Sequence, residues 1–232
     1  MIKYYEMKWN LIYLDKVTST NDVAKNLPCQ SVVVAREQTN GRGRCSRVWV
    51  SEADNLFCSV VLRSYGIKTP LLSFILGLSV VESLKGVDAK LKWPNDVLID
   101  GKKVAGILLE NEDDKIIAGV GINTNSAPVG DFLYPVGCLN GMFSNEVVLN
   151  SFLNNLELNL DIFEKEGFCK IRQKWLSYAI GVGQKISVQM PYLKLEGVFE
   201  DMTTEGAIQL KLNDTSCKYI TAGDVFLLNK GK

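Results

Sequence analysis

Three strand-like segments follow one another in the middle of the chain, and only short turns separate them. The turns carry Asp100-Gly101 and Asp113-Asp114, and an Asp-Gly pair is a strong short-range signal for a hairpin. Strands joined by such turns lie side by side and run antiparallel. The sequence therefore predicts an antiparallel meander made of residues 90–99, 103–110 and 115–123.

The elements around this meander fall into two regions. Apolar and β-branched runs predict strands, and N-cap residues or an early proline open the helices. The strands are expected at 11–17, 31–35, 55–63, 185–189, 194–199, 207–211 and 219–228, and the helices after 18–22 and at 69–84, 145–166 and 171–178. Only short alternating segments follow Gly181-Val182-Gly183, as in a small β-barrel. We expect an α+β fold with a mixed, mostly antiparallel sheet in a domain at 1–180, and a small all-β domain at 181–232.

Composition excludes several classes of protein. Lys and Arg total 26, as do Asp and Glu, so no net charge draws the chain to nucleic acid or to an anionic membrane. Histidine is absent, which excludes Ser-His-Asp and Cys-His catalysis and the usual zinc sites. The six cysteines form no Cys-x-x-Cys pair, and residues 1–10 lack the apolar core of a signal peptide. Reduced thiols in the cytoplasm are therefore expected.

A loop rich in glycine and arginine lies at residues 41–49, with the sequence Gly-Arg-Gly-Arg-Cys-Ser-Arg-Val-Trp. Guanidinium groups bind phosphate and carboxylate through paired hydrogen bonds, and glycine lets the backbone approach a ligand. A solvated basic turn would explain an isolated Arg-x-Arg pair, but not the interleaved glycines and Trp49. Nucleic-acid binding would need a wider basic surface. This arginine loop is therefore predicted to close over an anion.

Three further segments carry polar groups that suit the same kind of site. Lys92-Trp93-Pro94-Asn95-Asp96 supplies a carboxylate and an amide, and its proline implies a bend inside a strand-like run. Residues 119–123, Gly-Val-Gly-Ile-Asn, are either a simple strand end or a surface that a ligand approaches. Residues 18–21, Thr-Ser-Thr-Asn, are most simply a helix N-cap, which also presents N–H groups to a polar ligand. Together the segments predict a nucleotide-activating site.

In this order, the motifs resemble those of the biotin–protein ligase family, also called biotin–[acetyl-CoA-carboxylase] ligases or the BirA family. The resemblance runs from about residue 12 to the C-terminus, where residues 221–225 fit the end of the family's small domain. It implies a catalytic domain like that of class II aminoacyl-tRNA synthetases and an SH3-like C-terminal barrel. It also implies a short form without the N-terminal DNA-binding domain of bifunctional members, so DNA binding is not expected. The matching positions are Thr18–Asn21, Gln38, the arginine loop, Lys92–Asp96, Lys103, Gly106–Leu108, Gly119 and Gly121–Asn123.

The resemblance also implies roles for individual positions. Biotin would contact Ser19, Thr20, Asn21, Gln38, Gly41, Arg42, Gly43, Arg44, Lys103, Gly106, Gly119 and Gly121. The adenylate would contact Arg44, Arg47, Trp49, Asn95 and Asn123. The catalytic residues would be Arg44, Lys103, Asp96 and Lys92, with Asp96 also a ligand of Mg²⁺. The implied reaction joins biotin to ATP as biotinyl-5′-AMP and then transfers biotin to a lysine of a biotin carboxyl carrier domain.

Other interpretations stay open at the level of sequence. A lipoate–protein ligase or octanoyltransferase shares the fold, and a thiol mechanism could use Cys45 in the arginine loop. A non-catalytic biotin-binding module is a second alternative, and a DNA-binding regulator a weaker third. Cys45 and Ser46 stand where other members carry small or basic residues, and residues 124–144 match the family only loosely. A homodimer is compatible with the resemblance, although no residue requires one.

Overall fold

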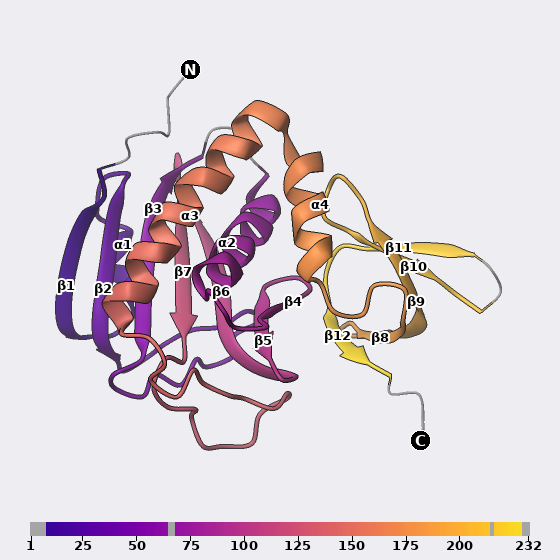
Figure 1. The fold of residues 1–232 in the computed structure, drawn as a ribbon, viewed down its shortest axis with the longest axis horizontal. Coiled ribbons are helices and arrows are strands. Elements are labelled where there is room, and N and C mark those ends of the chain that lie inside the picture. Colours follow the sequence, from indigo (N-terminus) through magenta and orange to yellow (C-terminus); the bar gives the residue numbers. More distant parts are fainter. Residues whose placement is uncertain (1–7, 65–67, 214–215, 229–232) are drawn as a thin grey trace.

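The computed structural model describes residues 8–64, 68–213 and 216–228. Residues 1–7, which hold most of the segment expected not to be a signal peptide, lie outside those ranges. Seven strands form a first sheet in the order β1-β2-β3-β7-β6-β5-β4 (Figure 1). β1 runs parallel to β2, and the other neighbouring pairs are antiparallel, which confirms the predicted mixed sheet. The strands are β1 (Asn10–Val17), β2 (Ser31–Gln38), β3 (Leu56–Arg63), β4 (Lys90–Lys92), β5 (Asp96–Ile99), β6 (Lys102–Glu112) and β7 (Lys115–Ile122).

The predicted meander is present, but its first segment is two strands rather than one. The run 90–99 folds back at Trp93-Pro94, whose peptide bond is cis, so β4 and β5 form a hairpin of their own. The turns at Asp100 and Asp113 have positive φ angles, as tight hairpin turns require. The proline inside the strand-like run therefore marks the bend that was expected there.

Helices cover the two faces of the first sheet unequally. α2 (Thr69–Ser83) and α3 (Asn145–Glu166) pack on one face, with α4 (Phe168–Tyr178) beside α2 (Figure 1). Among the helices of the described residues, the short α1 (Thr20–Ala24) alone packs against the other face, over β2, β3 and β7. Alternate strand residues therefore face two apolar clusters: Val60 lies in the large core and Val61 in the small cluster under α1. The part of this face that α1 leaves uncovered is where the candidate site lies.

The C-terminal strands form a second, antiparallel sheet in the order β11-β10-β9-β8-β12. The segment 219–228 was expected as one strand, and this is wrong. It divides at residues 221–223, and its halves join opposite edges of the sheet, because the break at Gly223 outweighs the alternation. The strands are β8 (Lys185–Gln189), β9 (Lys194–Met202), β10 (Ile208–Lys211), β11 (Cys217–Ile220) and β12 (Asp224–Leu227).

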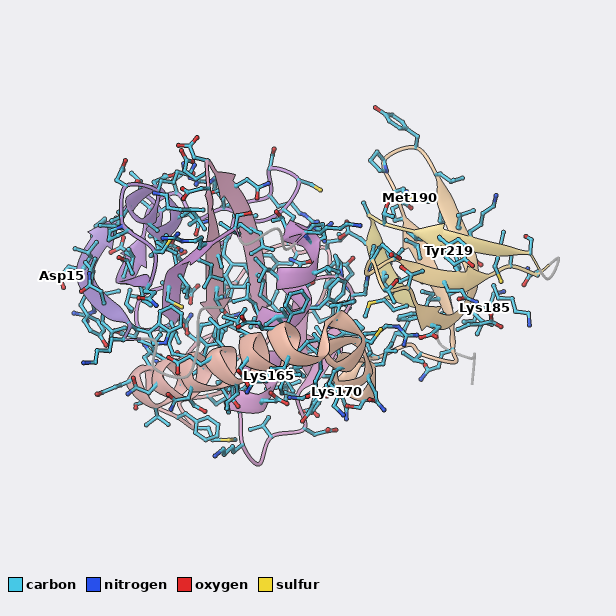
Figure 2. All side chains as sticks on the ribbon, turned by 90° about the horizontal axis from the view of Figure 1, so that it is seen from above. Asp15, Lys165, Lys170, Lys185, Met190 and Tyr219 are labelled. Atoms are coloured by element: carbon cyan, nitrogen blue, oxygen red, sulfur yellow. The ribbon has the colours of Figure 1, made fainter. Side chains whose placement is uncertain are left out.

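The second sheet lies beside the β4–β5 end of the first sheet and next to α4 (Figure 1). Trp93 Nε1 donates a hydrogen bond of 2.9 Å to the Gly206 carbonyl, and Arg172 Nε donates one to the Met202 carbonyl. Figure 2 shows the β8–β9 hairpin, marked by Met190, projecting away from the rest of the molecule. Among the described residues, no helix combines the length and apolar character needed to cross a membrane.

Candidate active site

Three glycines lie side by side on the α1 face of the first sheet. Gly119 on β7 pairs with Ser59 on β3, and Gly121 on β7 pairs with Gly106 on β6. Without side chains, these positions let other groups lie flat on the sheet. A Cβ on Gly119 would lie 2.5 Å from Asn21 Oδ1, and one on Gly121 would lie 2.6 Å from the Trp49 indole. The glycines were predicted to admit a ligand, and in the structure they admit Asn21 and Trp49.

A cavity opens in front of these glycines, with an empty volume of about 1100 Å³ that includes its solvent-open part. Most of the predicted site residues line it, whereas Gly41 and Lys92 do not. Gly41 instead accepts a backbone hydrogen bond from Trp49, and Lys92 lies behind Asp96. The predicted residues in the wall are Ser19, Thr20, Asn21, Gln38, Arg42, Gly43, Arg44, Arg47, Trp49, Asn95, Asp96, Lys103, Gly106, Gly119, Gly121 and Asn123.

The end of the cavity beside α1 carries uncharged hydrogen-bonding groups. Gln38 Oε1 accepts from the Thr20 backbone N–H at 2.9 Å and lies 3.1 Å from the Thr20 hydroxyl. Ser59 Oγ lies 2.6 Å from Asn21 Oδ1. Ser19 is the N-cap residue of α1, as expected, but its side chain makes no capping hydrogen bond. This end is therefore a set of fixed donors and acceptors that suits a polar, uncharged ring.

Arg42 of the arginine loop is paired with two carboxylates. Its two terminal nitrogens donate to the Asp22 carboxylate at 2.9 and 2.7 Å, and Nη2 also lies 3.2 Å from Glu110. These hydrogen bonds raise the pKa of Arg42 and lower the pKa of Asp22. The predicted anion-binding role of the loop therefore does not extend to the Arg42 guanidinium, because two acidic side chains occupy it.

The other two arginines lie at the opposite end of the cavity. Arg44 Nη1 donates to Asn95 Oδ1 at 2.8 Å, and the Asn95 amide donates in turn to the Ile107 carbonyl at 2.8 Å. Arg47 Nη2 pairs with Asp224 on β12 at 3.1 Å. Within the part of the chain that the structure describes, no carboxylate pairs with Arg44. Its charge is therefore available to an anion in the cavity.

Two lysines share one carboxylate beside these arginines. Lys103 Nζ lies 2.6 Å from Asp96 Oδ1, and Lys92 Nζ lies 3.9 Å from Asp96 Oδ2. Burial lowers the pKa of Lys92 to about 8. When both lysines are protonated, the group carries one net positive charge, which adds to that of Arg44. This end of the cavity therefore suits phosphate and carboxylate groups.

Asp96 was also predicted to bind Mg²⁺, and its surroundings do not fit a metal held by protein side chains. Both of its oxygens face ammonium groups. Over the described ranges, no cluster of three or more His, Cys, Asp or Glu side chains could hold a metal ion. No chemical step below therefore depends on a metal held by this chain.

Several residues of the cavity wall were not predicted. Asp224 lies in the segment 221–225 that resembles the family, but no role was assigned to it. Tyr134 lies in the aperiodic segment 124–144, so nothing in the sequence pattern marks it. The hydroxyl of Tyr134 and the indole N–H of Trp49 are buried and find no hydrogen-bond partner among the described residues. Buried polar atoms of this kind are places where a water molecule or a ligand can complete the hydrogen bonding.

Comparisons with known proteins agree with this geometry. The profile of the Biotin/lipoate A/B protein ligase family matches residues 11–125, and that of the Biotin protein ligase C terminal domain matches residues 182–228. The chain is 33% identical to the Bifunctional ligase/repressor BirA of Bacillus subtilis, over 97% of this chain and 76% of that protein. It is also 33% identical to the Biotin--[acetyl-CoA-carboxylase] ligase of Paracoccus denitrificans, over 92% of this chain and 98% of that protein.

Solved structures give the same relationship. The biotin protein ligase from Aquifex aeolicus in complex with biotin and ATP superposes with a TM-score of 0.85 at 30% sequence identity. The match covers 95% of this chain and 99% of that one. Sequence similarity over nearly the whole chain and the shared fold lead to the same assignment: this chain belongs to the biotin protein ligase family.

Proposed function

We propose that this protein is an ATP-dependent biotin–protein ligase. It activates biotin with ATP to biotinyl-5′-AMP and transfers biotin to a lysine of a biotin carboxyl carrier domain. One observation carries the proposal: a single cavity joins an uncharged hydrogen-bonding end near Thr20 and Gln38 to a cationic end near Arg44 and Lys103. The first end suits a ureido ring, and the second suits an acid group together with phosphates.

The chemistry follows from the weakness of a carboxylate as an acylating agent. A carboxylate oxygen of biotin attacks the α-phosphorus of ATP, the bond to the bridging oxygen breaks, and pyrophosphate leaves. Arg44 and Lys103 stabilise the negative charge that develops on the phosphoryl oxygens. The acceptor amine then attacks the acyl carbon, the bond from that carbon to the AMP oxygen breaks, and AMP leaves. Neither step needs a covalent enzyme intermediate, which suits a chain without histidine.

Asp96 orients the acceptor amine in this proposal. Its carboxylate lies between Lys92 and Lys103, so it is held in place by charge. We expect Asp96→Asn to slow biotin transfer from preformed biotinyl-5′-AMP by on the order of tenfold or more. Asp100→Asn, in the exposed turn between β5 and β6, is the matched control. Transfer by the Asp96 variant at the rate of the wild type would remove this role.

The pKa of the cysteine in the cavity wall argues against the thiol mechanism of an octanoyltransferase. Cys58 lines the same cavity as Lys103, as such a mechanism would require. However, burial raises the pKa of the Cys58 thiol to about 12, so the thiolate that would act as nucleophile is scarce at neutral pH. Cys45, the thiol of the arginine loop, is exposed and does not line the cavity that contains Lys103. The ligase reaction therefore remains the better account of the site.

The proposal is tested by offering biotin or lipoate with MgATP and following pyrophosphate release and the mass of a carrier domain. Biotin is expected to give both pyrophosphate and a biotinylated lysine. Lys103→Gln should reduce pyrophosphate release by on the order of a hundredfold, because it removes the cation beside Asp96. Lys102→Gln, one position away and exposed, should leave the rate unchanged. Binding of biotin without pyrophosphate release would favour a non-catalytic module, and activity with lipoate alone would favour the other ligase.

The second sheet takes part in this proposed site. Asp224 on β12 reaches the cavity and pairs with Arg47 of the arginine loop. We infer that residues 1–180 form the catalytic domain and that residues 181–232 help to hold the loop over the nucleotide. The supply of ATP and the six unpaired thiols favour the cytoplasm as the place of action.

A further inference from the structure

The second half of the segment 124–144 is anchored to the site by backbone hydrogen bonds. The Lys103 N–H donates to the Pro135 carbonyl at 2.8 Å, and the Gly137 N–H donates to the Lys103 carbonyl at 2.9 Å. The side-chain amide of Asn123 also donates to the Gly137 carbonyl, at 3.0 Å. These contacts link the segment to β6 and to the end of β7. Tyr134, next to Pro135, is therefore held in position by the first sheet.

The ring of Tyr134 covers the ammonium group of Lys92. Lys92 Nζ lies 2.9 Å from the centre of the Tyr134 ring and 5.9 Å from that of Phe226 on β12. The two rings are themselves 5.0 Å apart. A cation over the face of an aromatic ring is attracted by the electron density of that face. With Asp96 3.9 Å away, Lys92 lies between two rings and a carboxylate, and its side chain is only 7% exposed.

The interactions of Tyr134 with Lys92 and Phe226 are made by its ring. Its hydroxyl has no hydrogen-bond partner among the residues that the structure describes. The lowered pKa of Lys92 has burial as its largest cause, which agrees with a close aromatic cover. A lysine side chain has several rotatable bonds, so without this cover Lys92 could adopt other rotamers.

We propose that Tyr134 is a positioning residue whose ring holds the Lys92 ammonium beside Asp96 at the cationic end of the cavity. The inference rests on the proposed function and deepens it, because the group formed by Lys92, Asp96 and Lys103 is net positive only when both lysines are protonated. Phe226 forms the second wall of this enclosure, so both the first and the second sheet contribute to it. Tyr134 acts only through Lys92, and the reaction needs nothing else from its ring.

The contact itself can be tested without any substrate. Acetylation of Lys92 by acetic anhydride is followed by mass spectrometry as a function of pH, which gives the rate for the fully neutral amine. Tyr134→Leu removes the ring, and we expect this rate to rise about fivefold or more relative to the rate for Lys103 in the same sample. Tyr134→Phe keeps the ring and should stay within about twofold of the wild type. An equal rise for Lys92 and Lys103 in the leucine variant would mean general loosening and would overturn the proposal.

Adenylate formation gives the second readout. With biotin and MgATP, Tyr134→Leu should lower kcat for pyrophosphate release by on the order of tenfold and leave the KM for biotin near the wild-type value. Tyr192→Leu, at the fully exposed tip of the β8–β9 hairpin, is the matched control and should change neither. A Tyr134→Leu variant with the kcat of the wild type would refute the role. A Tyr134→Phe variant in which Lys92 is acetylated as fast as in Tyr134→Leu would also refute it. A wild-type protein that forms no adenylate would refute the proposed function and leave the acetylation result intact.

Discussion

The ion pair between Asp22 and Arg42 contributes to the free energy of unfolding in a way that depends on pH. Two hydrogen bonds from Arg42 hold the pKa of Asp22 below its ordinary value. A carboxyl group whose pKa is lowered by folding stabilises the protein above its unfolded-state pKa, and this contribution is lost as the pH falls through the folded-state pKa. We expect Asp22→Asn to lower the free energy of unfolding at neutral pH by less than about 1 kcal/mol, because Asp22 is 40% exposed.

This difference should vanish in acid, at a pH below the folded-state pKa of Asp22. Urea denaturation of both proteins at neutral and acidic pH measures it. Asp113→Asn, in the exposed turn between β6 and β7, serves as the control and should stay within about 0.5 kcal/mol of the wild type. A loss of equal size at both pH values would show that the ion pair is not its cause.

Gly119 is a second residue whose effect can be predicted from one distance. A Cβ at this position would lie 2.5 Å from Asn21 Oδ1, so Gly119→Ala must move the Asn21 side chain. The contact between Asn21 and Ser59 would then be lost at the uncharged end of the cavity. We expect biotin affinity to fall by on the order of tenfold, measured by titration calorimetry. Unchanged affinity would mean that Asn21 does not help to form the biotin site.

The sequence was most informative for site residues that lie in dense motifs. The arginine loop and the pair Asn95-Asp96 carry polar and charged residue types that are rare in a core, so their place at one cavity could be predicted. Glu110, Tyr134 and Asp224 were missed because their importance depends on tertiary neighbours. Glu110 lies within β6, and Asp224 reaches Arg47 from the other sheet. No local pattern encodes such contacts.

At the scale of elements, short-range signals predicted the structure well where they agreed with each other. Turn residues and alternation both supported the meander, and apolar periodicity supported α3, which the structure shows to be capped by Ser144. They failed at residues 219–228, where alternation continued across a break at Gly223. α4 begins at Phe168, earlier than expected, because Gly167 alone separates it from α3. The ends of helices and strands therefore depend on single residues such as Gly167 and Gly223. Periodicity is a property of a whole segment and does not show where it ends.

The contact between α2, α3 and α4 contains a buried polar network that can be tested. Asn159 on α3 is fully buried; its amide donates to Ser79 at 3.1 Å and to Glu82 at 2.8 Å on α2, and its carbonyl accepts from Lys174 on α4 at 2.8 Å. Asn159→Ala removes these three buried hydrogen bonds, while Lys174 keeps its ion pair with Glu82 at 3.0 Å. We expect a loss of about 2 kcal/mol in the free energy of unfolding.

Chemical denaturation measures this loss, and the same helix supplies the control. Asn154→Ala lies on the exposed face of α3 and should be neutral or slightly stabilising, since alanine favours a helix more than asparagine does. If both variants lost the same amount, helix propensity rather than the buried network would explain the result.

For the whole molecule, the decisive feature is the junction of the two sheets, because β12 contributes Asp224 and Phe226 beside the cavity. Gly206 lies at this junction with φ +82°, and a Cβ there would lie 2.5 Å from the Phe74 ring on α2. Phe74 packs on Phe168 and Trp175, with centroid distances of 5.7 and 5.3 Å, so it has little room to move.

Gly206→Ala should therefore lower the free energy of unfolding by about 3 kcal/mol, as the sum of left-handed backbone strain and overpacking. Gly183→Ala has the same kind of strain, with φ +74°, but nothing lies within 4 Å of its Cβ, so it should lose only about 1 kcal/mol. Denaturation followed by tryptophan fluorescence compares the two variants. Pyrophosphate release should also fall more in Gly206→Ala, because moving the second sheet separates Asp224 from Arg47. Equal losses in both variants would show that the junction adapts, and that the second sheet can shift without disturbing the cavity.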